Sequence, residues 1–421
     1  MQIAAIERQP FGDTIEISAQ VRSLPNHAPD FRLWFRFPGF LADGLTADGD
    51  AFLAALPPVA VRCHEPLEIG GTVSEQLLSG CGQIMELWHR WDKRDRPVRI
   101  VPDGMRDASY PAATEVCAAD VHAERPAGIV GCAGIKKVAA FFSLGVDSFY
   151  TLLKNLNAEK GDGRISHLIS VHGFDVPLEN QELFAKVAAG VQTVADELGL
   201  RAIFVSTNLR ALSNRFSGWG RYQHGAALAS VGLCLQRLFR RIYIGSGTTY
   251  ADAFPWGSHP LTDPLWSTES LQFSFDGAEA SRVQKIKWQV AQSDVALAHL
   301  RVCWENRGNR YNCCRCEKCL RTMLNLHVAG ALHRCKTFDP TIDLARLRGI
   351  VVADANSATF MRENLKALEQ SGQDCEMQQC LRQALARRAR LRTKIREAIG
   401  NVFLRYLGEP VYRCYRSVRH D

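Results

Sequence analysis

A short polar turn between an apolar run and a helical pattern carries the first groups that could do chemistry. The turn lies between the apolar run 138–142 and a helix predicted over 148–157, and it reads Ser143, Leu144, Gly145, Val146, Asp147, Ser148. A helix N-terminus offers free backbone N–H groups and a partial positive charge, and both suit an anion. Gly145 permits a close backbone approach, and Ser143 and Ser148 add hydroxyl donors. The pattern therefore predicts a phosphate site, although the lysine of a Walker loop is absent.

A group of cysteines far downstream has the spacing of metal ligands. Within the segment CWENRGNRYNCCRCEKC, these are Cys303, Cys313, Cys316 and Cys319. Four thiolates at this spacing can converge tetrahedrally on zinc, and Cys314 could take the place of Cys313. Disulfides are the alternative, but the first residues, MQIAAIERQPF, lack the apolar region of a signal peptide. We therefore expect a cytoplasmic protein with a structural zinc site.

The polar turn resembles the Ser-Gly-Gly-x-Asp-Ser loop of the PP-loop ATP pyrophosphatases. Four positions of the family pattern match, and Leu144 stands where the family has its first glycine. Members of that family split ATP between its α and β phosphates, transfer AMP to a substrate oxygen and release pyrophosphate. The resemblance implies that residues 143–148 bind ATP and that Ser143, Asp147 and Ser148 take part in catalysis. A serine-capped helix start without a ligand is the alternative.

The turn and the cysteines together resemble the 7-cyano-7-deazaguanine synthase (QueC) family over residues 135–330. That family adenylates the carboxylate of 7-carboxy-7-deazaguanine, lets ammonia displace AMP to give an amide, and dehydrates the amide to a nitrile. About 130 residues precede the similar region and about 90 follow it, which makes the chain more similar to the longer QueC-like proteins of bacterial anti-phage operons. Those proteins are thought to modify a protein partner. The resemblance thus implies ATP, magnesium and zinc as cofactors, a 7-deazapurine substrate, and ammonia or a protein amine as acceptor.

The elements that must position these groups alternate along residues 137–330. Strands are predicted at 137–142, 165–171, 201–206 and 241–245, and helices at 148–157, 181–199, 222–239, 279–292 and 316–328. This alternation predicts an α/β fold with a doubly wound parallel sheet, in which ligands bind beyond the carboxyl ends of the strands. An α+β domain is expected at 1–130, with amphipathic strand 31–37, helix 73–91 capped by Ser74, and a linker at 107–136. A helical, basic region is expected at 331–421.

Several segments that follow the predicted strands are candidates for the binding site. By resemblance, His172 and Gly173 after the second strand and Ser206 and Thr207 after the third would hold adenine and ribose. The long aperiodic loop after the fourth strand is the expected substrate loop, with candidates Gly245, Ser246, Asp252, Phe254, Trp256, His259 and Asp263. Aromatic rings there could stack on a deazaguanine and a carboxylate could accept from its N–H edge, although Asp263 could instead cap a turn.

Other charged groups have more than one interpretation. His224 and His259 could neutralise phosphate or move a proton, or be structural. The arginines at 210, 215 and 221 flank Gly218 and Gly220, which could form a lid over triphosphate or a solvated basic loop. The cations at 282, 285 and 287 are interpreted as a solvated helix face. Asp147 could orient the loop or reach a magnesium ion that is held mostly by phosphate oxygens.

The charge of the chain is concentrated at its end. Residues 382–421 carry a formal charge of +8, whereas the whole chain carries +7. A basic amphipathic helix is predicted over 381–399; it could contact nucleic acid, bind an acidic protein, or, most commonly for such helices, pack on its own domain. No apolar run is long enough to span a membrane. The expected function is adenylation of a deazapurine carboxylate, and the alternatives are a PP-loop tRNA-modifying enzyme and a non-catalytic nucleotide-binding module.

Overall fold

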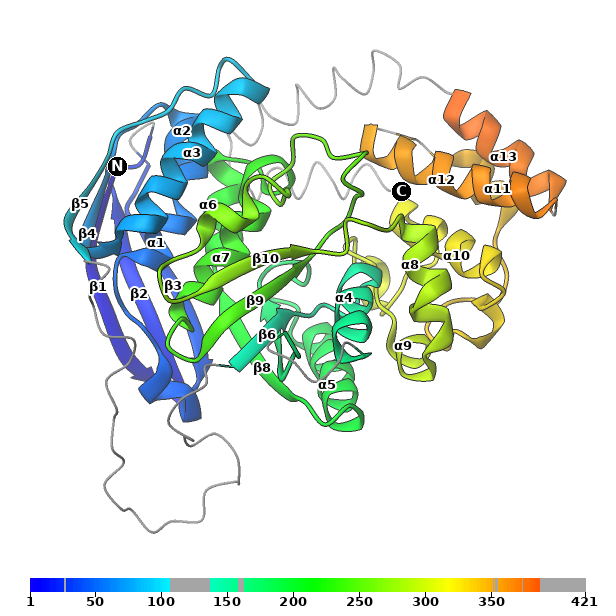
Figure 1. The fold of residues 1–421 in the computed structure, drawn as a ribbon, viewed down its shortest axis with the longest axis horizontal. Helices are drawn as coiled ribbons and strands as arrows, with labels where there is room; N and C mark the ends of the chain where they lie inside the picture. Colours follow the sequence, from blue (N-terminus) through cyan, green and yellow to red (C-terminus); the bar gives the residue numbers. More distant parts are fainter. Residues whose placement is uncertain are drawn as a thin grey trace, which may run out of the picture.

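A single ten-stranded sheet runs through the computed structural model (Figure 1). The structure describes residues 1–25, 28–106, 137–157, 163–350, 352, 355–372 and 374–386. The strands are β1 (Gln2–Phe11), β2 (Thr14–Arg22), β3 (Phe31–Pro38), β4 (Leu67–Ser74), β5 (Ile100–Arg106), β6 (Lys137–Phe141), β7 (His167–His172), β8 (Arg201–Thr207), β9 (Phe239–Gly245) and β10 (Gln272–Asp276). The predicted linker 107–136 and the basic residues beyond 386 lie outside the described residues.

The strand order is β10-β9-β6-β7-β8-β3-β2-β1-β4-β5. The five strands from β10 to β8 are all parallel, and counted from β6 their order is 3-2-1-4-5, which is a doubly wound order. The predicted α/β class with a mostly parallel sheet is therefore confirmed. β3 pairs antiparallel with β8 through Phe35 with Thr207 and Arg36 with Ser206, so the N-terminal strands extend the same sheet.

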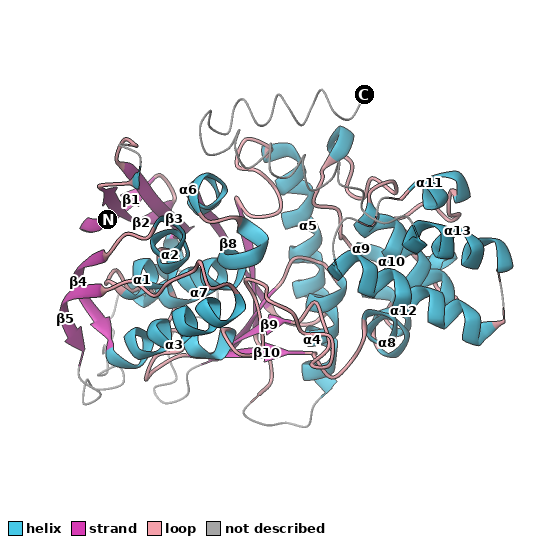
Figure 2. Cartoon of the chain, turned by 90° about the horizontal axis from the view of Figure 1, so that it is seen from above, coloured by secondary structure: helices cyan, strands magenta, loops and turns pink. Residues whose placement is uncertain are grey.

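Helices cover the sheet on both faces, as Figure 2 shows from above. They are α1 (Asp50–Ala55), α2 (Pro57–Cys63), α3 (Glu75–Trp91), α4 (Val146–Asn157), α5 (Gln181–Glu197), α6 (Leu209–Phe216), α7 (His224–Cys234), α8 (Arg282–Trp288), α9 (Asp294–His299), α10 (Glu317–Val328), α11 (Leu344–Gly349), α12 (Ala355–Ser371) and α13 (Cys375–Ala386). The sheet has a hydrophobic core on each face. Successive side chains of a strand point to opposite faces, so Ala139 and Phe141 of β6 belong to one core and Val138 and Ala140 to the other.

The predicted elements agree with most of the observed ones, and the differences are local. Ser74 caps α3 as expected, since its hydroxyl accepts from the backbone N–H of Leu77 at 3.0 Å. The helix predicted at 222–239 ends at Cys234, and the one predicted at 279–292 is shorter, from Arg282 to Trp288. The edge strand β10 was not predicted.

The end of the described chain is helical, as predicted for residues 331–421. Its helices α11 to α13 pack on one another, and α12 also lies against α8 and α10 (Figure 1). Leu381 and Leu385 of the predicted basic helix belong to α13, where they join the second core. The C-terminal helices are thus attached to the part of the fold that follows the loop 143–148.

Candidate functional site

The turn 143–148 joins β6 to α4 and has the backbone of a glycine-rich loop. Leu144 adopts a left-handed φ of 61°, although its side chain is fully buried. A left-handed conformation costs a non-glycine residue about 1–2 kcal/mol, which burial of a leucine side chain, worth about 1.5–3 kcal/mol, offsets. The Ser148 hydroxyl donates to the Gly145 carbonyl at 3.0 Å. The leucine at the family's glycine position therefore keeps a conformation that glycine favours.

The turn lies at the point where the order of the parallel strands reverses. β6 pairs with β7 on one side and with β9 on the other, and the turn follows its carboxyl end. Gly245, the last residue of β9, is so close that an added Cβ would lie 3.0 Å from the backbone carbonyl oxygen of Asp147. Ligands of open α/β sheets bind in the crevice at such a reversal. Both Gly245 and the turn therefore border the expected ligand position.

Asp147 is held by two cations of α8. It pairs with Arg282 through Oδ2 and with the Lys285 ammonium through Oδ1 at 3.2 Å, and Lys285 also donates to the carbonyl of Ser246. Burial opposes ionisation of Asp147, but the charges of Arg282 and Lys285 outweigh it and keep the pKa of its carboxyl well below its usual range. Burial also lowers the pKa of Lys285. With both oxygens engaged by cations, Asp147 is better placed to orient the loop than to bind magnesium.

The interpretation of α8 as a solvated face was wrong for two of its three cations. Arg282 is 7% exposed and Lys285 only 1% exposed, whereas Lys287 is exposed as expected. The reason is the register of the helix, because Arg282 lies one turn before the buried Ile286. The face of α8 that packs on the fold therefore also presents two cations to the loop 143–148.

A second group of charges surrounds Asp175, after β7. Arg210 lies 3.8 Å from its carboxylate and rests on the ring of Trp219 at 4.7 Å. Burial opposes ionisation of Asp175, but the nearby charges of Lys318 and Arg210 outweigh it and lower the pKa of the carboxyl. Lys318 is also near Arg282 and Asp147, and burial lowers its pKa. Asp175 and the loop 143–148 thus share a cationic surrounding.

His224, at the start of α7, is neutral at pH 7. Burial lowers its pKa to about 4, although Asp175 acts in the opposite direction. Its ring lies 5.8 Å from that of Trp219. His224 therefore brings no positive charge for a phosphate, and its neutral imidazole can accept a proton.

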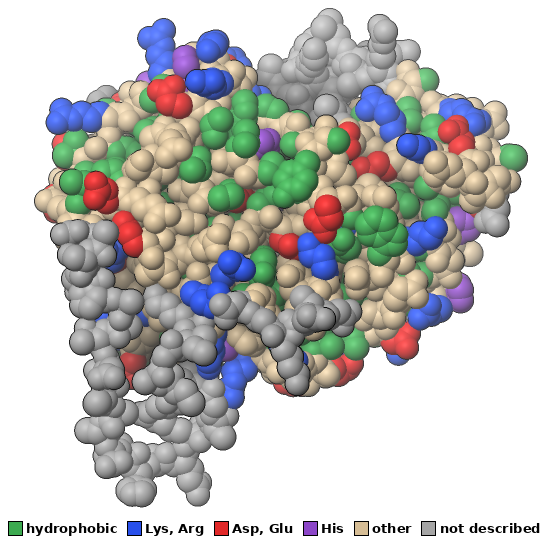
Figure 3. Space-filling model, viewed as in Figure 1, with side chains coloured by type: hydrophobic (Ala, Val, Ile, Leu, Met, Phe, Trp, Pro, Cys, Tyr) green, Lys and Arg blue, Asp and Glu red, His purple; other side chains and the backbone are tan. Residues whose placement is uncertain are grey.

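Two buried guanidinium nitrogens support an anionic ligand in this place. Nε of Arg282 and Nε of Arg301 are inaccessible to solvent and have no hydrogen-bond partner among the described residues. A buried donor without an acceptor is unfavourable by about 1–3 kcal/mol. Figure 3 shows Lys and Arg interspersed with Asp and Glu over one face of the molecule. The residues present fit a polyphosphate.

The four predicted cysteines come together in a buried cluster. The sulfur atoms of Cys303, Cys313, Cys316 and Cys319 all lie within 4.8 Å of one another. Those of Cys313 and Cys319 are 3.8 Å apart, which matches two corners of a tetrahedron around zinc with Zn–S bonds of about 2.3 Å. Backbone N–H groups donate to the thiol sulfurs of Cys313 and Cys316 at 3.3 and 3.4 Å. The cluster is compatible with zinc.

Cys314 is not part of this cluster, which removes the alternative left by the sequence. Its backbone has a left-handed φ of 54°, and its sulfur accepts from the backbone N–H of Asp339 at 3.4 Å. Burial raises the pKa of its thiol to about 11. Cys313 is therefore the ligand candidate, and Cys314 is a buried thiol.

Residues next to the cysteine cluster are hydrogen-bonded to the loop 143–148 and to the segment after β7. The backbone N–H of Arg301 donates to the carbonyl of Leu144 at 2.8 Å, and the side chain of Asn306 donates to the carbonyl of Asp175 at 2.8 Å. Lys318 lies between Cys316 and Cys319 in the sequence. A metal that fixed the four cysteines would therefore also fix groups that border the candidate site.

Two of the predicted adenine and ribose residues, His172 and Thr207, use their side chains within the fold. His172 is 2% exposed, stacks on Phe184 with ring centroids 4.0 Å apart and lies 3.0 Å from the carbonyl of Pro177. The Thr207 hydroxyl donates to the carbonyl of Trp34 at 2.7 Å, and Ser206 is paired with β3. Gly173, at a φ of 100°, lies against the Thr207 carbonyl. The half-buried Ser206 hydroxyl and the backbone groups of these residues remain as candidate contacts.

The substrate loop is divided between the site and the N-terminal helices. Ser246 contacts Lys285, whereas His259 packs on Trp91 of α3 at 4.8 Å. The carboxylate of Asp252 accepts from Thr249 on an exposed turn at 2.7 Å. Phe254 and Trp256 contact each other at 5.7 Å, and the Trp256 ring touches Gly220 of the predicted lid. In that segment Arg221 pairs with Asp92, and the Arg215 guanidinium lies over Phe216.

Asp263 caps the loop from inside and should make its stability depend on pH. It accepts from the Ser258 hydroxyl at 2.6 Å and the His259 backbone at 3.1 Å, yet burial raises its pKa to about 7. A folded-state pKa above the unfolded value of about 4 means that this stabilisation decreases as pH rises from about 4 to 7. We expect the melting temperature of Asp263→Asn to vary less with pH over that range than the melting temperature of the wild type. An unchanged pH profile of the variant would contradict this role.

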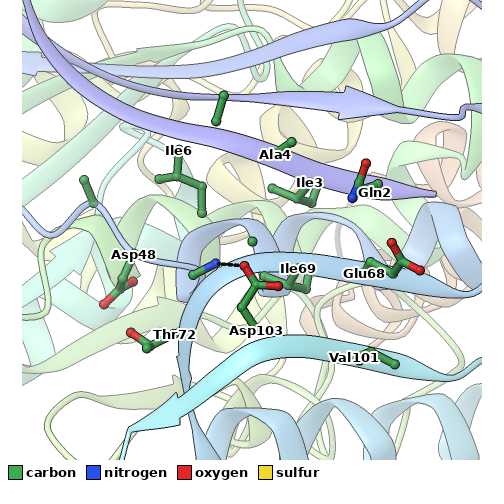
Figure 4. Close-up of a pocket in the computed structure, with 14 residues that line it drawn as sticks. Gln2, Ile3, Ala4, Ile6, Asp48, Glu68, Ile69, Thr72, Val101 and Asp103 are labelled. Atoms are coloured by element: carbon green, nitrogen blue, oxygen red, sulfur yellow. Dashed lines mark hydrogen bonds between the residues drawn. The ribbon is translucent and has the colours of Figure 1, made fainter.

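A hollow of about 680 Å³ lies elsewhere, between β1 and β4 (Figure 4). Its lining includes Asp48, Glu68 and Asp103, and Asp103 accepts from the backbone N–H of Gly71 at 3.0 Å. A lining with carboxylates repels a phosphate. This hollow is therefore not part of the candidate site at the loop 143–148.

Comparisons of the chain with protein-family models, with curated proteins and with solved structures each gave no match. Within the described residues, no helix has both the length and the apolar character needed to cross a bilayer. The function therefore has to follow from the chemistry of the site itself.

Sequence reasoning missed several charged residues of this site. Lys318, Arg301 and Arg321 come from the cysteine segment and α10, and none of them was a candidate. The sequence feature that could have identified Lys318 and Arg321 is their position on either side of Cys319, because the cysteine cluster fixes where these residues lie. Asp175 was noted only as the end of the segment after β7.

Proposed function

We propose that the chain is an ATP-dependent ligase that adenylates a 7-deazapurine carboxylate and passes the acyl group to ammonia or to an amine of a protein partner. The observation that supports this most is the loop 143–148 at the reversal of strand order, beside the buried cations Arg282 and Lys285. Cations, helix N-terminus and close backbone approach are what a polyphosphate needs. The identity of the acyl substrate rests on the QueC resemblance.

The first proposed step is transfer of AMP. A carboxylate oxygen of the substrate attacks the α-phosphorus, the bond to the α–β bridging oxygen breaks, and pyrophosphate leaves with the electron pair. The cations of α8 and α10 stabilise the negative charge that develops on the leaving group. Magnesium would add charge neutralisation while bound mainly to phosphate oxygens. Asp147 keeps Arg282 and Lys285 beside the loop.

In the second step an amine attacks the acyl carbon of the adenylate. AMP leaves with the electrons of the carbon–oxygen bond, and the amine gives up a proton. His224 is unprotonated at pH 7 because burial lowers its pKa to about 4, so it can accept a hydrogen bond from the attacking amine, and the proton passes on to solvent water. The role is consistent with its position beside Asp175 and Trp219.

The residues around Asp175 suggest how the deazapurine is recognised. Trp219 offers a partly exposed ring, and the Asp175 carboxylate can accept from the N–H edge of a guanine-like base. Asp252 and Asp263 are less suitable, because one is bonded on an exposed turn and the other is buried inside its loop. We therefore assign the carboxylate role to Asp175.

Product analysis tests the proposed function. The pure protein is incubated with magnesium and ATP, with and without 7-carboxy-7-deazaguanine, and AMP and pyrophosphate are measured. We expect both products in equal amounts and only with the deazapurine. Pyrophosphate that appears only with tRNA would favour the tRNA-modifying alternative. ATP binding without AMP under any of these conditions would favour a binding module.

A further inference from the structure

Phe360 of α12 lies between two arginines that come from different helices. The guanidinium carbon of Arg282 in α8 is 4.6 Å from the centre of its ring, and that of Arg321 in α10 is 4.1 Å away. All three residues are buried, with exposed fractions of 3% for Phe360, 7% for Arg282 and 6% for Arg321. A single aromatic side chain from the C-terminal helices therefore contacts two cations, one of which, Arg282, pairs with Asp147 of the loop 143–148.

Two guanidinium groups on one ring repel each other unless anions balance them. In the structure Arg282 pairs with Asp147, and Arg321 lies 3.4 Å from Glu317. Glu363 lies one turn along α12, and burial raises the pKa of its carboxyl in spite of the Arg282 charge. Lys285 and Lys318 are also close to Arg282, so the two arginines lie within a group of four cations that can attract an anion.

The ring restricts what the arginines can do. A guanidinium group over an aromatic face is held in place by the attraction of the ring for its charge, and this contact is stronger when it is desolvated. Fixed donors lose less conformational entropy when a phosphate binds than free arginine side chains do. Nε of Arg282 is buried and has no hydrogen-bond partner among the described residues.

We propose that Phe360 is a positioning residue that holds Arg282 and Arg321 as a clamp for the terminal phosphates of the bound nucleotide. This inference rests on the proposed function and adds to it that α12, outside the QueC-like region, completes the phosphate site. Removal of the aromatic face should therefore weaken binding of polyphosphates without removing any charge.

The test compares variants of the full-length protein by calorimetric titration with ATP and with inorganic pyrophosphate. Phe360→Leu and Phe360→Met keep an apolar side chain but lose the ring, and Phe360→Tyr keeps it. We expect about tenfold weaker binding of both ligands for the first two and near wild-type binding for Phe360→Tyr. Leu368→Ala is the matched control, because Leu368 is 1% exposed on the same helix and its carbonyl accepts from Gln378 of α13.

The control should melt at a lower temperature but bind pyrophosphate with unchanged affinity. Wild-type affinity in Phe360→Leu and Phe360→Met would overturn the clamp and leave the proposed function standing. If Leu368→Ala lost as much affinity as Phe360→Leu, the effect of Phe360 would be explained by packing alone, and this would also overturn the clamp. A wild-type protein that binds neither ATP nor pyrophosphate would overturn both the clamp and the proposed function.

Discussion

Cys313→Ala is expected to release the metal, lower the stability of the protein and abolish nucleotide binding together. The three effects are linked because the cysteine segment donates from Arg301 to the Leu144 carbonyl and from Asn306 to the Asp175 carbonyl. Structural zinc contributes on the order of 10 kcal/mol of folding free energy in small zinc domains. Elemental analysis should fall from about one zinc per chain to none. The unfolding free energy and the ATP affinity are measured on the same sample.

The neighbouring cysteine supplies the control. Cys314→Ala removes an identical side chain one position away, whose sulfur accepts from Asp339 rather than facing the cluster. We expect it to keep its zinc and its affinity for ATP, with a stability loss of about 1 kcal/mol from the missing sulfur contacts. Metal loss in Cys314→Ala, or retained zinc in Cys313→Ala, would show that the ligand set is different. Zinc loss with unchanged ATP affinity would mean that the cluster does not support the loop.

The parts of the site that the sequence predicted are those encoded by short spacing. The turn after β6 and the cysteine cluster each depend on residues within about twenty positions, so local pattern was enough to find them. Leu144 shows the limit of such matching, because it departs from the family pattern while keeping the left-handed backbone. What a pattern requires at that position is a conformation, and the packing of a buried leucine can enforce it.

The parts that the sequence did not predict depend on contacts between distant elements. Asp147 and Lys285 are 138 positions apart, and no sequence feature near either residue indicates that the two side chains form an ion pair. Charged residues are rarely buried unless they are paired, so without the partner a helix cation is taken as solvated. The pairing of β3 with β8 was not predicted for the same reason. The amphipathic alternation in β3 fixes which face of the strand is buried but not which strand lies beside it.

Lys285→Met should affect both stability and catalysis strongly. The ammonium is 1% exposed, pairs with Asp147 at 3.2 Å and donates to the Ser246 carbonyl, so its loss leaves two buried acceptors poorly satisfied. Breaking a buried pair costs about 3–5 kcal/mol, and Arg282, which still pairs with Asp147, should keep the loss near the lower value. Formation of AMP should fall about a hundredfold, because a cation beside the phosphates is missing. Chemical denaturation and the AMP assay measure the two effects.

Lys287→Met is the matched control for that substitution. It makes the same change two residues further along α8, on an exposed side chain, and should alter stability by less than about 0.5 kcal/mol. Activities are compared at a temperature where near-UV circular dichroism shows both variants folded, which separates lost catalysis from lost folding. If Lys285→Met were less stable but formed AMP at the wild-type rate, Lys285 would serve the fold alone. Arg282 and the cations of α10 would then have to stabilise the negative charge of the phosphates.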